Sequence, residues 1–159
     1  MHRKLLIITT LLIFFATFAN TVLSENRDLG VGLVLGEPTG FSVKYMKSKT
    51  IGYDAALAWS FADESHLHVH ADMLHHNWTL LQREFGITRG ALPLYYGIGG
   101  RIKLADETRI GVRFVVGISY LIEDGPMDAF FEIAPIMDIA PKTELNGNVA
   151  LGLRYWFSR

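Results

Sequence analysis

Apolar side chains alternate with small or polar ones along most of the chain beyond residue 28, and this period of two constrains the fold more than any other feature. The pattern is clearest over residues 65–75, where one face carries Leu67, Val69, Ala71 and Met73. The other face carries His66, His68, His70 and Asp72. Residues two apart share one face of a strand, whereas a helical face repeats every 3.6 residues. The pattern therefore predicts β-strands with one apolar face each.

Eight such segments follow one another, separated by short stretches that suit turns. They are Leu29–Leu35, Phe41–Met46, Ile51–Phe61, Ser65–His75, Leu92–Leu104, Arg109–Ile122, Asp128–Ile139 and Leu145–Phe157. The stretch Asn77–Ala91 either extends the strands beside it or forms a loop, and His75 and His76 before it are expected at a loop or interface. Pro135 lacks an N–H group for a strand ladder, which predicts a β-bulge there.

The volume of the two faces decides which one points inward. An eight-stranded barrel has an interior just wide enough for side chains, and about thirty large apolar side chains would overfill it. The opposite face is rich in Gly, Ala and Ser and leaves room for a few long charged side chains. We therefore expect an all-β fold, an eight-stranded antiparallel up-and-down transmembrane β-barrel with its apolar face toward lipid.

The inward face would carry a polar network of nearly balanced charge. Its predicted members are Lys44, Asp54, His66, His68, His70, Asp72, Arg101, Lys103, Arg113, Glu132, Asp138 and Arg154. An unpaired charge is costly in a poorly hydrated interior, so these groups should pair with one another. The sequence thus predicts a lumen plugged by its own side chains.

The N-terminus combines a basic start, Met1–Lys4, with an apolar run over Leu5–Phe18. This is typical of a secretory signal peptide. Cleavage after Ala19 or after Ser24 fits the small residues nearby, and Ser24 is preferred, which gives a signal peptide at 1–24 and one barrel domain at 25–159. The alternative, a membrane anchor helix, would need about 20 apolar residues.

Composition excludes several other classes of protein. The chain has no cysteine, so neither a disulfide framework nor a lipidated cysteine is possible. Its 15 basic and 16 acidic residues give a net charge of -1, and no basic cluster is present. Nucleic acid is therefore not expected as a partner.

Three stretches together resemble a known family. They are residues 30–40 (GVGLVLGEPTG), 67–72 (LHVHAD) and 92–101 (LPLYYGIGGR). They resemble a family of small, uncharacterised outer-membrane β-barrel proteins of Gram-negative bacteria, similar to the OmpA/OmpX-type barrels. The resemblance spans nearly all of the chain beyond the signal peptide. It implies an outer-membrane location and a barrel fold, and no established activity.

The final stretch Gly152–Phe157 looks like the C-terminal signal by which the barrel-assembly machinery recognises its clients. Gly152, Tyr155 and Phe157 would carry that signal.

Histidines at alternate positions of one strand are candidate metal ligands. His66, His68 and His70 lie roughly 6–7 Å apart along one strand face, and Asp72 follows them, so two imidazoles could converge on one ion. A second strand would have to supply further ligands, and the sequence identifies none, so polar filling of the lumen is the preferred interpretation. No cofactor is expected.

Catalysis finds little support in the sequence. Ser60 and Ser119 are expected to point inward with no histidine beside either, and no phosphate loop, metalloprotease helix or serine elbow is present. We expect a monomeric structural or interaction protein that contacts outer-membrane lipid and is not an enzyme. The alternatives are a soluble periplasmic barrel that binds an apolar ligand and a lipid-modifying outer-membrane enzyme.

Overall fold

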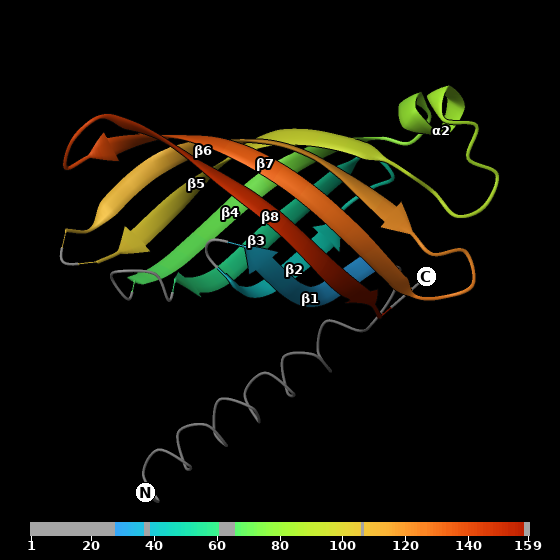
Figure 1. The fold of residues 1–159 in the computed structure, drawn as a ribbon, viewed down its shortest axis with the longest axis horizontal. Helices are drawn as coiled ribbons and strands as arrows, with labels where there is room; N and C mark the ends of the chain where they lie inside the picture. Colours follow the sequence, from blue (N-terminus) through green and yellow to red (C-terminus); the bar gives the residue numbers. More distant parts are fainter. Residues whose placement is uncertain (1–27, 37–38, 61–65, 106, 158–159) are drawn as a thin grey trace, which may run out of the picture.

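Eight antiparallel strands close into one barrel in the computed structural model, which describes residues 28–36, 39–60, 66–105 and 107–157 (Figure 1). In chain order they are β1 (Asp28–Gly36), β2 (Thr39–Met46), β3 (Ile51–Ser60), β4 (His66–Asn77), β5 (Leu94–Leu104), β6 (Arg109–Leu121), β7 (Met127–Ala140) and β8 (Glu144–Trp156). For residues 28, 60 and 66 only the backbone is described. The predicted eight-stranded fold is confirmed, and the predicted signal peptide lies outside the described residues.

Pairing between the first and last strands closes the barrel. Each strand pairs with its neighbours in the sequence, and β8 returns to β1 with Gly32 opposite Arg154 and Gly36 opposite Ala150. Closure leaves no unpaired sheet edge to template association with another chain.

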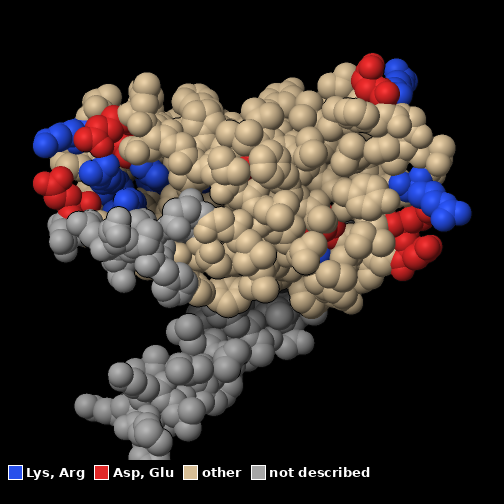
Figure 2. All heavy atoms as spheres, in the orientation of Figure 1, with Lys and Arg blue, Asp and Glu red and all other residues tan. Residues whose placement is uncertain are grey.

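The large apolar side chains point outward and the small or polar ones point inward, as the volume of the two faces predicts. Outward side chains are large and apolar and lie half-exposed, as with Leu33 at 54% and Leu151 at 56% of their full accessible area. Inward side chains are buried and mostly small or polar. On the face seen in Figure 2, a wide uncharged band crosses the middle of the barrel, and most of the visible Lys, Arg, Asp and Glu lie at the two ends. Such a band suits a hydrocarbon environment.

The two ends of the barrel differ in their connections. β1 begins and β8 ends at the same end, here called the terminal end, which also carries the β2–β3, β4–β5 and β6–β7 connections. The opposite end carries the β1–β2, β3–β4, β5–β6 and β7–β8 connections, which are short. Figure 1 shows the C-terminus and the helix α2 (Leu80–Glu84) on the same side of the barrel. The longest connection, residues 78–93, therefore lies at the terminal end.

Residues 78–93 form a connection that contains the helix α2. The stretch for which the sequence allowed either strand extension or a loop is therefore mostly a loop. β4 runs to Asn77, whose side-chain oxygen accepts hydrogen bonds from the N–H groups of Thr79 and Leu80 before α2. Gln82 donates to the carbonyl groups of Ile87 and Gly90 and accepts from the N–H of Leu92. Gly90 has a φ of 68°, a conformation that favours glycine. Of the described helices, none has the length and apolar character needed to cross a membrane.

The predicted bulge at Pro135 is wrong. Pro135 lies opposite Gly147 in a regular ladder with β8, and the register with β6 is the same on both sides of it. The register shift falls instead between Ile110 and Gly111, which pair with Ala140 and Asp138. Proline fits the extended backbone and removes one ladder donor, which does not require an extra residue.

Candidate functional site

The polar interior of the barrel is the first candidate site. Of the predicted lumen residues, nine are buried: Lys44, Asp54, His68, Asp72, Arg101, Arg113, Glu132, Asp138 and Arg154. His70 and Lys103 are partly buried, and the side chain of His66 lies outside the described residues. The structure adds Asp128 and His76, with 1% and 2% of their areas exposed. The expectation that His76 lies at a loop or interface is wrong, because β4 continues past it to Asn77. Alternate residues of a strand share one face, so His76 points inward like His68 and Asp72.

Arg154 forms the centre of one ion-pair cluster. Its Nη1 donates to Asp54 Oδ2 over 2.6 Å, and its Nε donates to Asp128 Oδ1 over 3.2 Å. The guanidinium carbon also lies 3.8 Å from the centroid of the Phe130 ring. One buried arginine thereby contacts carboxylates from β3 and β7 and an aromatic face, which compensates its removal from water.

Arg113 forms a second cluster near the middle of the barrel. Its Nη2 donates to Glu132 Oε1 over 2.7 Å, and its Nε donates to Asp72 Oδ1 over 3.3 Å. The hydroxyl of Tyr95 donates to the other oxygen of Glu132 over 3.2 Å. Gly99 faces Asp72, and a Cβ there would lie 2.0 Å from Asp72 Oδ1, so only glycine leaves room for this carboxylate. β4, β5, β6 and β7 are thus joined through one network.

A third cluster lies toward the opposite end. Arg101 forms a two-pronged pair with Asp138, with Nε to Oδ1 at 3.0 Å and Nη2 to Oδ2 at 2.5 Å. Asn146 donates a further hydrogen bond to Asp138 Oδ2 over 2.7 Å. Bidentate geometry is the strongest arrangement of an arginine and a carboxylate. The three clusters follow one another along the lumen and bridge strands that are not neighbours.

Side chains leave little free volume among these clusters. The cavity beside Asp54, Arg113 and Glu132 measures about 20 Å³, which is room for roughly one water molecule. Leu74, Tyr95, Val115 and Ala134 form a buried apolar cluster on the inward face.

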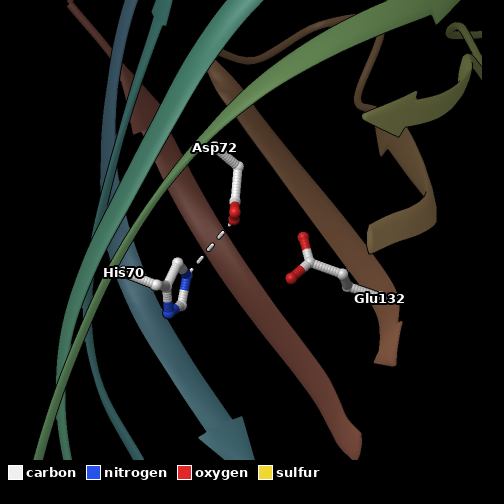
Figure 3. Close-up of side chains that lie close together, drawn as sticks. All are labelled: His70, Asp72 and Glu132. Carbon is white, nitrogen blue, oxygen red and sulfur yellow. Dashed lines mark ion pairs between the residues drawn. The ribbon is translucent and has the colours of Figure 1, made fainter. Parts of the chain in front are cut away.

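The metal candidates are only partly brought together. Among the described residues, ligand atoms of His70, Asp72 and Glu132 lie within 4.8 Å of one another, and Figure 3 shows the three side chains converging from β4 and β7. Glu132 would be the second-strand ligand that the sequence could not identify. Both carboxylates, however, already accept hydrogen bonds from Arg113. A divalent ion would have to displace that guanidinium, so the geometry favours an ion-pair network over a metal centre.

Ser119 gains a histidine neighbour that the sequence did not reveal. Ser119 and His76 line the same cavity at the terminal end. Neither ring nitrogen of His76 has a hydrogen-bond partner among the described residues, so His76 does not activate the Ser119 hydroxyl here. The side chain of Ser60 lies outside the described residues.

The residues of the predicted assembly signal lie on the last strand. Tyr155 and Phe157 point outward, with ring centroids 5.2 Å apart, while Gly152 points inward against the ring of Phe130. Two adjacent outward aromatics at a strand end fit an interfacial aromatic girdle.

Comparison with known proteins supports the architecture. The N-terminal β-barrel domain of OprF from Pseudomonas aeruginosa superimposes with a TM-score of 0.57 at 10% identity, covering 82% of this chain and 96% of that domain. The fold is that of a small eight-stranded outer-membrane barrel. Neisserial surface protein A, NspA, gives a TM-score of 0.49 at 14% identity over 82% of this chain and 94% of its own. No family description and no curated relative matches the sequence.

Proposed function

We propose that this chain is a small outer-membrane barrel with a structural or interaction role and a closed lumen. The observation that carries the proposal is the set of three arginine clusters across the lumen, with a cavity of only about 20 Å³ beside the central one. Hydrated ions need a continuous water path, and we infer that these side chains interrupt it. The barrel is therefore proposed not to act as a general pore near neutral pH.

The outer surface supports insertion into lipid over a soluble role. Large apolar side chains such as Leu33, Phe41, Phe114 and Leu151 lie about half-exposed around the barrel. Soluble proteins rarely expose apolar patches of that extent. A soluble periplasmic barrel would bury this face, so the membrane role is the better explanation.

The orientation follows from the even strand number. Both termini lie at the terminal end, and a chain that reaches the membrane from the periplasm would keep both there while its hairpins cross. We propose that the signal peptide exports the chain, that the assembly machinery inserts it, and that it stays a monomer because the barrel has no open edge. Connection 78–93 and α2 would then face the periplasm, and an interaction partner would be sought on that side.

Three measurements test the proposal. Purified protein in planar bilayers should show no steady conductance near neutral pH, and unboiled protein in detergent should migrate differently from boiled protein on a denaturing gel. In cell fractionation the protein should stay with the outer membranes after a carbonate wash. Large, stable, open channels would contradict the closed lumen, and release by carbonate would favour the soluble alternative.

A further inference from the structure

A second cavity lies at the terminal end, apart from the ion-pair clusters. It measures about 330 Å³ and is formed where the ends of β2, β4, β6 and β8 meet the β2–β3 turn. Small-molecule sites in proteins measure roughly 300–1,000 Å³, so this cavity is large enough for a small ligand.

The walls of the cavity are mainly apolar. Met46, Pro93 and Leu121 contribute aliphatic surface, and the indole rings of Trp78 and Trp156 contribute aromatic surface. The indole N–H of Trp78 is already used, since it donates to the carbonyl oxygen of Lys49. Such walls favour an apolar body in the occupant.

Three buried polar atoms in the wall have no partner among the described residues. They are both ring nitrogens of His76 and the indole nitrogen Nε1 of Trp156. Only 2% of His76 and 9% of Trp156 is exposed. Leaving buried hydrogen-bonding atoms unsatisfied is costly, and native structures normally provide a partner. A bound polar group would supply it.

The charge of the wall is positive. Lys44 and Lys49 line the cavity, and no aspartate or glutamate is among its lining residues. The ammonium of Lys44 forms none of the described ion pairs and lies instead 4.1 Å from the centroid of the Tyr95 ring. Lys44 is 2% exposed, and the carboxylates of Asp54, Asp128 and Glu132 attract its ammonium without forming a described ion pair with it. A hydrogen-bond acceptor bound in the cavity would give this ammonium a direct partner.

We propose that this cavity binds a small amphipathic carboxylate, of the kind represented by a medium-chain fatty acid. Its carboxylate would accept hydrogen bonds from Lys44, from the Trp156 indole and from a nitrogen of His76, and its chain would pack on Met46 and Leu121. The ligand would enter from the compartment at the terminal end. This role goes beyond the proposed structural function, because a closed lumen does not require a ligand site.

Octanoate and 1-octanol are the probes, since they share a chain length and differ in head-group charge. The indole N–H resonances of the three tryptophans in the ¹⁵N-labelled protein, held in zwitterionic detergent, are followed during titration. Octanoate should shift the Trp156 resonance saturably. The Trp59 resonance should not shift, because Trp59 lies at the end of β3 far from the cavity. A shift of Trp156 without a shift of Trp59 therefore distinguishes cavity binding from general partition into the micelle.

Lys44→Met should weaken octanoate binding about tenfold, the loss expected for one charge-assisted hydrogen bond, and should leave octanol binding unchanged. Lys47→Met is the matched control, because Lys47 is exposed on the neighbouring turn and does not line the cavity. Should Lys44→Met not fold, Trp156→Phe removes one donor, and Trp78 then reports binding. Equal shifts at Trp59 and Trp156, equal effects of the two lysine variants, or equal affinity for octanol and octanoate would each overturn the proposal.

Discussion

Arg154 of β8 and Asp54 of β3 are a hundred positions apart in the sequence, yet their side chains are joined by a hydrogen bond of 2.6 Å. β3 and β8 are not neighbours in the barrel, so this bond crosses the lumen. Arg154 also binds Asp128 of β7, the strand beside it. The cluster therefore links three strands, and its full set of contacts exists only when the barrel is closed.

Replacing Arg154 by Met should destabilise the folded barrel strongly. Asp54 and Asp128 would lose their partner in a buried site, and breaking a buried pair costs about 3–5 kcal/mol. Urea unfolding in detergent micelles measures the change in the free energy of unfolding. The matched control is Arg109→Met, whose pair with Glu144 is exposed and worth about 0–1 kcal/mol. Equal losses in the two variants would show that the lumen cluster contributes little to stability.

Replacing Leu151 by Arg should disfavour the inserted state. Leu151 points outward near the middle of β8, and an arginine facing lipid at the bilayer centre costs about 2–4 kcal/mol in barrels of this kind. The same substitution at Leu145, close to the strand end, should cost much less. A spin label at Leu151 or Leu145 reports whether the position is surrounded by hydrocarbon or by water. Full solvent access at both positions would contradict a lipid-facing outer surface.

Deleting residues 155–159 should abolish assembly into the membrane and leave export intact. The deletion removes the pairing of Trp156 with Gly30 and the hydrogen bond from the Phe157 N–H to the Leu29 carbonyl, both of which close the barrel. Export would depend on the proposed N-terminal signal peptide, which the deletion leaves in place. Heat-dependent gel migration measures assembly, and Phe85→Ala on the exposed connection is a control that should assemble normally. A truncated protein that assembles normally would remove the role assigned to Tyr155 and Phe157.

The alternation of side chains determined most of the fold. Strand pleating is a local property of the backbone, so Leu67, Val69 and Met73 on one face and His68 and Asp72 on the other could be assigned without knowing any long-range contact. Volume then decided which face points inward. The same reasoning placed Arg113, Arg154 and Glu132 in one lumen.

Only the tertiary structure decided which of those charges meet. The partner of an inward side chain across the lumen depends on the stagger of strands distant in sequence, and alternation carries no information about that stagger. Asp54, Asp72 and Asp138 are alike in their local patterns, yet they pair with Arg154, Arg113 and Arg101 respectively.

The ends of the strands were likewise beyond the reach of the local pattern. The last inward residue of a strand, such as His76, is recognised only from the pairing that extends past it, here between Asn77 and Leu94. The cavity lined by His76, Lys44 and Trp156 forms because the ends of four strands meet one turn in space. Period-two alternation is thus fixed by each segment alone, whereas the contacts that join segments are set by the geometry of closure.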